Sequence, residues 1–165
     1  MNKVISIGNQ GFDKLRTEDY YYIDKSDFIS EWWENGDDVT LITRPRRFGK
    51  TLAMSMLANF FDIRQKNESL FQGLAVSSDS SLCKEWMNQW PVVFLSLKNI
   101  DGLTFSTAYQ QLAYEIGLLF EKHKYLLTDE KIGPAEKELF ERLKNRSASE
   151  VEVSRSLQFL LQLMT

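Results

Sequence analysis

The feature that most constrains the fold of this chain is the stretch VTLITRPRRFGKTLAMSMLANFF, which runs from Val39 to Phe61. Its first part, Val39–Thr43, has the apolar and β-branched composition of a short buried strand. A basic loop follows from Arg44 to Gly49, and an apolar segment with helical spacing begins at Lys50. A strand that passes through a loop into a helix predicts one unit of an α/β fold.

The loop ends in Gly49-Lys50-Thr51, the last three positions of a phosphate-binding (Walker A) signature. Gly49 lets the backbone turn where a side chain would block a ligand, and the amides after it point towards a phosphate. Lys50 would neutralise the terminal phosphates, and the Thr51 hydroxyl would bind Mg²⁺ as a metal ligand. The start of the helix adds a partial positive charge.

The first glycine of that signature is replaced by Arg44. The strand before the loop and the helix after it favour a phosphate site over a basic surface loop that contains these residues by chance. Either Arg46 or Arg47 could contact phosphate or a neighbouring subunit. The predicted nucleotide-binding residues are Arg44, Pro45, Arg46, Arg47, Phe48, Gly49, Lys50 and Thr51.

A second apolar run, VVFLSL at Val92–Leu97, follows Trp90-Pro91 and predicts another buried strand. Two strands joined through a long crossover that contains a helix are typical of a parallel sheet. We therefore expect a single domain over residues 1–165, with a P-loop NTPase-type parallel sheet flanked by helices.

Apolar spacing and capping residues predict the helices. Asp24 is an expected N-cap and Gly36 an expected stop, Gly133-Pro134 begins a helix, and Ser147 with Glu150 forms a capping box. Ala53, Met56, Leu57 and Phe60 share one helix face that should pack on the sheet. The expected helices lie within Gly11–Asp19, from about Asp24 to Asn35, from Lys50 to about Phe61, from about Ser81 to Asn88, and in three segments after Phe105.

The string ITRPRRFGKT, preceded by YYIDKSDFI, resembles the amino-terminal domain of the bacterial predicted AAA-ATPase-like family over about Ile7 to Leu97. It is more distantly similar to archaeal ATPases whose loop reads Gly-Pro-Arg-Arg-x-Gly-Lys-[Ser/Thr]. The resemblance implies ATP and Mg²⁺ as cofactors. It also implies that Tyr22, Ile23 and Lys25 lie on the base side of the nucleotide; the alternative is that Tyr20–Tyr22 cover an edge of the sheet.

Phosphoryl transfer also needs a carboxylate at the end of a second strand. Asp101 is the nearest, but the intervening residues should make it miss the metal. In the resembled ATPases the carboxylate-bearing Walker B strand comes after the segments present here. We therefore expect a truncated domain that binds ATP without hydrolysing it, whose partners are the missing C-terminal part of the same protein and, through exposed sheet surface, further copies of itself.

The net charge of −3 makes the basic loop a local feature and argues against a broad nucleic-acid surface. The second hypothesis is a non-catalytic module that binds nucleic-acid phosphate or an acidic partner. The third is acid–base catalysis by His123 with Glu121, whose neighbours resemble an exposed helix end. Cys83 is expected to be an inert packing residue, and one Cys with one His argues against zinc. No membrane span or signal peptide is evident, which predicts a cytoplasmic location.

Overall fold

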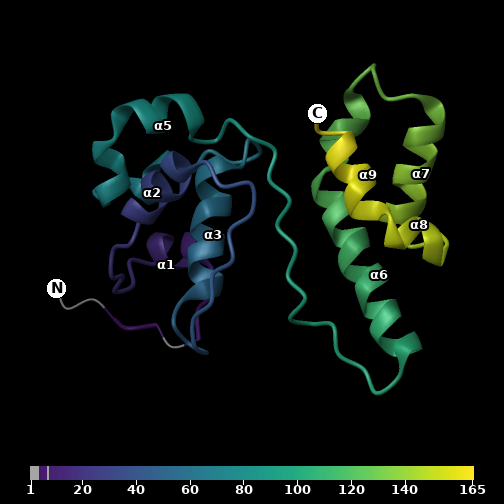
Figure 1. The fold of residues 1–165 in the computed structure, drawn as a ribbon, viewed down its shortest axis with the longest axis horizontal. Coiled ribbons are helices and arrows are strands. Elements are labelled where there is room, and N and C mark those ends of the chain that lie inside the picture. Colours follow the sequence, from purple (N-terminus) through teal and green to yellow (C-terminus); the bar gives the residue numbers. More distant parts are fainter. Residues whose placement is uncertain (1–3, 7) are drawn as a thin grey trace. The chain divides into compact units, whose positions relative to one another are not determined.

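The computed structural model describes residues 4–6 and 8–165, which form two compact units that divide after Val92 (Figure 1). The first unit contains α1 (Phe12–Thr17), α2 (Asp27–Asn35), α3 (Lys50–Phe61), α4 (Glu68–Phe71), the 3-10 turn η1 (Ala75–Ser78) and α5 (Ser80–Trp86). The second unit contains α6 (Phe105–Lys122), the 3-10 turn η2 (Lys124–Thr128), α7 (Pro134–Lys144), α8 (Glu150–Ser154) and α9 (Ser156–Gln162).

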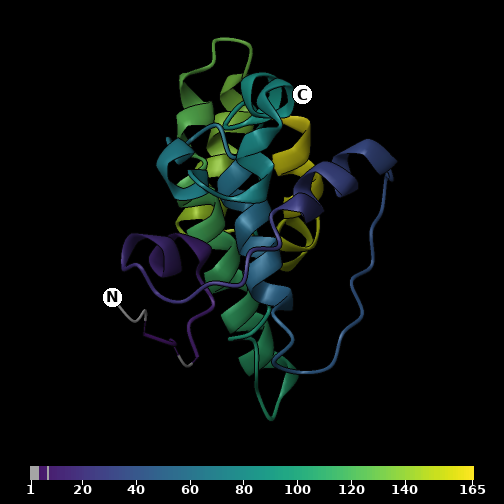
Figure 2. The same cartoon turned by 90° about the vertical axis from the view of Figure 1, so that its left-hand side faces the viewer.

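The predicted α/β fold with a parallel sheet is wrong, because residues 4–6 and 8–165 contain no strand. Val39–Thr43 belongs to the long loop between α2 and α3 (Figure 2), where Val39 and Leu41 are 87% and 83% exposed. Val92–Leu97 is also without regular structure. The described residues make a single isolated parallel bridge, between Asp62 and Trp90.

The physical reason is that a strand exists only where a second backbone pairs with it. The apolar residues of both segments meet the side-chain requirement of a buried strand, but within the described part of the chain neither segment pairs its backbone with a second strand. The predicted self-association relied on an exposed sheet surface, and the described residues form no such sheet.

The aromatic centre of the first unit's core comes from α1, α3 and α4, and α2, η1 and α5 add Ile29, Val76 and Leu82. Met56 and Phe60 of α3 are buried as predicted, but they pack against helices rather than a sheet. Phe12 of α1 and Phe60 both contact Phe71 of α4, with ring centroids 5.0 and 5.2 Å away. The helix predicted within Gly11–Asp19 is confirmed as α1.

The helix predicted from Asp24 begins slightly later, as α2. Its N-cap position is Ser26, while the Asp24 carboxylate accepts hydrogen bonds from the Ser26 amide and from the amide of Ala75, at 2.9 and 2.7 Å. The predicted stop at Gly36 is confirmed, since Gly36 is left-handed (φ 63°) and donates its amide to the carbonyl of Trp33.

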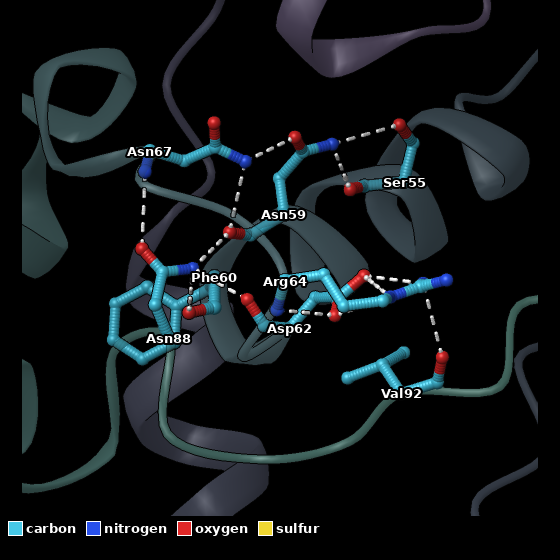
Figure 3. A network of polar contacts seen from close by, with 8 residues as sticks. All are labelled: Ser55, Asn59, Phe60, Asp62, Arg64, Asn67, Asn88 and Val92. Carbon is cyan, nitrogen blue, oxygen red and sulfur yellow. Dashed lines mark hydrogen bonds and ion pairs between the residues drawn. The ribbon is translucent and has the colours of Figure 1, made fainter. Parts of the chain in front are cut away.

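The carboxyl end of α3 is held by a network of polar side chains (Figure 3). The amide Nδ2 of Asn88 donates to three carbonyls at that end, those of Asn59, Phe60 and Asp62, at 3.1–3.2 Å. Asn88 Oδ1 accepts from the amide of Asn67 at 3.0 Å. These bonds satisfy carbonyls that a helix end leaves unpaired. They therefore anchor the carboxyl end of α3, which is the end opposite the basic loop.

An ion pair extends this network. Arg64 binds the Asp62 carboxylate with both Nε and Nη2 and also donates to the carbonyl of Val92 at 3.4 Å (Figure 3). Asp62 is only 4% exposed, so the pair neutralises a buried carboxylate. The turn after α3 is thereby joined to the last residue of the first unit.

The second unit is a helical hairpin in which α6 and α7 pack side by side (Figure 1). Phe120 of α6 and Phe140 of α7 are completely buried, with ring centroids 4.9 Å apart. The helix start at Pro134 is confirmed. The capping box predicted at Ser147 and Glu150 is instead formed two positions later, by Ser149 and Glu152, and it begins α8.

Candidate functional site

The basic loop joins α3 at the position expected from the sequence. α3 begins at Lys50, and Gly49 is its N-cap with a left-handed backbone (φ 77°). Residues 43–49 are exposed and Lys50 is half-buried. The loop is therefore open to solvent and leads directly into the positive end of a helix dipole.

The sign of φ alternates along the last residues of the loop. Arg47 and Gly49 both have positive φ, 69° and 77°, whereas Phe48 between them does not. Backbones in which right- and left-handed residues follow one another can turn successive amide N–H groups towards one side, as in anion-binding nests. The loop thus has local geometry suited to phosphate, although the strand that was expected before it is missing.

The Lys50 side chain folds back over the loop. Its ammonium donates a hydrogen bond to the Pro45 carbonyl at 3.0 Å and another to the Arg44 carbonyl. Carbonyl oxygens are neutral acceptors, and a phosphate oxygen is a stronger partner for an ammonium. Lys50 is therefore placed at the loop and can exchange these carbonyls for a phosphate.

The other loop cations extend into solvent. Arg44, Arg46 and Arg47 are exposed, and within residues 4–6 and 8–165 no acidic side chain forms an ion pair with them. Phe48 is 65% exposed beside them. This end of the unit carries concentrated positive charge in a chain whose net charge is −3.

Thr51 is exposed in the first turn of α3 and can offer one hydroxyl oxygen. The part of the chain that the structure describes holds no cluster of three or more His, Cys, Asp or Glu side chains arranged to bind a metal. Mg²⁺ usually keeps several waters and binds to substrate phosphates with few protein ligands, so one hydroxyl fits an ion that arrives with a nucleotide.

The three predicted base-side residues differ in their placement. Tyr22 is half-buried and packs on α3, where its hydroxyl donates to Met56 Sδ at 3.3 Å and burial raises its pKa. Met56 lies about 9 Å from Lys50 along the helix axis, at 1.5 Å per residue. Ile23 (65% exposed) and Lys25 face solvent. The structure therefore attaches Tyr22 to the helix of the loop and leaves the other two free to meet a ligand.

The other catalytic candidates lie in the second unit. The amide of Asp101 donates to Gln111 Oε1 at 2.6 Å, and Gln111 Nε2 donates to the Asp101 carboxylate at 3.1 Å. The expectation that His123 lies at an exposed helix end is wrong, since it is completely buried. Glu121 is exposed and accepts a hydrogen bond from Lys124 at 2.7 Å, so the two proposed partners lie in different environments.

A hollow of about 660 Å³ lies on the first unit, between α4 and α5, with Phe71, Cys83 and Met87 in its lining. The Cys83 thiol donates to the Val76 carbonyl at 3.4 Å, and burial raises its pKa. A raised pKa keeps the thiol protonated and unreactive, which agrees with the packing role expected of Cys83.

Sequence reasoning missed the left-handed conformation of Arg47 and the contact of Lys50 with the carbonyls of its own loop. Neither has a signal in the residue pattern, because left-handed backbone favours Gly, Asn or Asp rather than Arg. The positions of Gly49, Lys50 and Thr51 at the start of α3 were predicted correctly.

The left-handed residues Arg47 and Gly49 and the lysine at the start of α3 are features that phosphate-binding loops of other proteins share. The model of the predicted AAA-ATPase family (AAA-ATPase-like) matches residues 6–155, and the chain belongs to this family. The resemblance noted from ITRPRRFGKT is thereby confirmed.

The chain is also similar to a protein of Azotobacter chroococcum mcd 1 described as an uncharacterized protein in the vnfD 5′ region. The two are 41% identical over 95 residues, which cover 57% of this chain and 17% of the relative. The match therefore spans less than a fifth of that protein. No solved structure matches the chain. Among the residues described, none of the helices has the length and apolar character required to cross a membrane.

Proposed function

We propose that residues 44–51 bind the phosphate groups of a nucleotide, with ATP as the ligand that family membership favours. The observation that carries the proposal is the position of the Lys50 ammonium over a loop whose Arg47 and Gly49 are both left-handed. This arrangement combines an ammonium group with backbone amides at the positive end of α3.

On binding, the Lys50 ammonium would leave the carbonyls of Arg44 and Pro45 for a phosphate oxygen. The amides around Gly49 would donate to the same phosphate, and the Thr51 hydroxyl would hold the Mg²⁺ that accompanies the nucleotide. The ion would supply neutralisation of phosphate charge. Ile23 and Lys25 are proposed to meet the base side of the nucleotide, with Tyr22 fixing their segment to α3.

Isothermal titration of the full chain with Mg-ATP tests this proposal. Lys50→Ala is expected to weaken binding by about 10- to 100-fold, the usual cost of a lost hydrogen bond to a charged group. Lys66→Ala is the matched control, because Lys66 is an exposed lysine of the same unit outside the loop, and it should bind as the unaltered chain does. A parallel titration with Mg-GTP measures the preference for the base.

Two results would contradict the proposal: no measurable Mg-ATP binding, or the same affinity in the Lys50→Ala variant. In a further outcome, the chain would fail to bind nucleotide and would bind DNA with an affinity that falls steeply as salt rises. The loop would then belong to a non-catalytic module that binds nucleic-acid phosphate. We expect no phosphate release from ATP in these samples. Asp101, the candidate that the sequence offers for the second metal-binding carboxylate, is hydrogen-bonded to Gln111.

A further inference from the structure

Four residues other than glycine have left-handed backbone in the described part of the chain: Asp19, Arg47, Asn88 and Arg146. Asp and Asn tolerate this conformation, whereas for most other residues the Cβ atom meets the neighbouring carbonyl oxygen. The two arginines are therefore the unusual cases, and comparing them shows what each side chain contributes.

The Arg146 side chain is used inside the chain. Its guanidinium carbon lies 4.0 Å from the centre of the Tyr114 ring, a cation–π contact. Its stem lies close to Gly117, where an added Cβ would come within 3.0 Å of Arg146 Cγ. These contacts on α6 offset the cost of the left-handed backbone (φ 62°).

Arg47 has the same backbone conformation (φ 69°) but no such contact. The side chain is exposed, and within residues 4–6 and 8–165 it makes no hydrogen bond, ion pair or ring contact. A glycine would adopt this backbone without cost. Local strain with no internal compensation is typical of residues whose side chain acts on a ligand.

We propose that Arg47, rather than Arg46, is the loop arginine that binds the nucleotide phosphates. The inference rests on the proposed function, and it decides between two residues that the sequence treats alike. Arg46 is not among the residues with positive φ, so its backbone places no special demand on the residue type at that position.

The chemistry of the two cations is complementary. The guanidinium of Arg47 presents several N–H donors in a planar fork that matches two oxygens of a phosphate. The Lys50 ammonium is a compact charge that lies on the carbonyl side of the same loop. Together they would hold a polyphosphate from two directions, with Arg47 setting its orientation.

The test compares Mg-ATP affinity in Arg47→Asn and Arg46→Asn by isothermal titration. Asn is chosen because it accepts left-handed backbone, so the loop keeps its shape when the guanidinium is removed. Arg47→Asn should bind about tenfold more weakly or worse, and the loss of affinity in Arg46→Asn should be clearly smaller. Arg47→Lys, which keeps the charge but loses the fork, should lie between them.

Thermal melting of the free variants separates ligand binding from a structural role. Arg47→Asn should melt at or above the temperature of the unaltered chain, because the strained arginine has been replaced by a tolerant residue. A lower melting temperature would mean that the Arg47 side chain stabilises the free loop, and would overturn the inference.

Affinity of Arg47→Asn within twofold of the unaltered chain, or an equal or larger loss in Arg46→Asn, would also overturn it. These outcomes leave the proposed function intact as long as the unaltered chain binds Mg-ATP and Lys50→Ala binds it more weakly. Failure of the unaltered chain to bind Mg-ATP would reject the proposed function and this inference together, so the two failures are distinguishable.

Discussion

The two units of the chain satisfy their backbone polar groups in different ways. In the second unit, α6 and α7 are 18 and 11 residues long, and most of their amides and carbonyls pair within the helix. In the first unit the helices are 4 to 12 residues long, and more of their ends need outside partners. Side chains distant in the sequence supply these partners. Asn88 donates to carbonyls at the end of α3, Arg16 donates to the Leu70 and Gln72 carbonyls, and Asp24 accepts from the Ala75 amide.

This difference bears directly on the candidate site. α3 carries the basic loop at its amino end, while its carboxyl end is fixed by Asn88 and by the turn at Asp62. A loop that we propose binds an anion is thereby mounted on an element that is held by contacts far along the chain. The second unit needs no such device, because its apolar core and its local ion pairs form from neighbouring segments.

The largest expected effect tests the core of the second unit. Phe120→Ala removes a completely buried ring that meets Phe140 at 4.9 Å and should destabilise the unit by about 3–5 kcal/mol. Hydrogen exchange should show lost protection in α6 and α7. Phe105→Ala is the control, since that ring is 76% exposed and its removal should cost less than about 1 kcal/mol. Equal loss of protection in α1 and α3 would break the distinction between the units.

A smaller effect is expected from the polar network of the first unit. Asn88→Ala removes the donor to three carbonyls and places Ala in a left-handed backbone, which should cost about 2–4 kcal/mol. All four tryptophans, Trp32, Trp33, Trp86 and Trp90, lie in this unit, so their fluorescence during urea unfolding reports on it.

Asn88→Gly sharpens the same comparison, because Gly tolerates the left-handed backbone and isolates the loss of the side chain. It should be less destabilising than Asn88→Ala. If both variants unfolded at the urea concentration of the unaltered chain, the network would not be what holds the end of α3.

The smallest effect concerns pH. The Ser149 amide, the Arg142 guanidinium and the Ser149 hydroxyl hydrogen-bond to the Glu152 carboxylate and lower its pKa from 4.5 to about 2. Because the folded-state pKa is depressed, this stabilisation is present above about pH 4.5 and is lost as the pH falls towards 2. Helix content at α8, followed by circular dichroism, should fall over this interval.

Glu152→Gln should reduce that pH dependence, whereas Glu130→Gln, which alters an exposed glutamate outside the cap, should preserve it. An unchanged acid transition in Glu152→Gln would show that the capping box contributes little to the second unit. Such a result would make its stability depend on apolar packing alone.

The helices of both units were largely predictable from the sequence, and the reason is local. α3 begins at Lys50 and α2 stops at Gly36 because these features depend on residues within one turn. The capping box moved from Ser147 to Ser149 because both serines precede a glutamate at a suitable spacing. The burial of His123 was missed because its charged neighbours indicate a surface, while the turn after α6 directs its ring inward.

The sequence by itself determined where helices form, which of their faces are apolar, and that a basic loop ends in Gly49-Lys50-Thr51 at the start of one of them. Only the tertiary structure decided that Val39–Thr43 stays unpaired, that Asn88 holds the end of α3, and that Arg47 takes a left-handed backbone. A helix bonds residues four positions apart and is readable from a short window. A strand, a distant cap or a strained loop depends on a partner or neighbour that the local pattern does not specify.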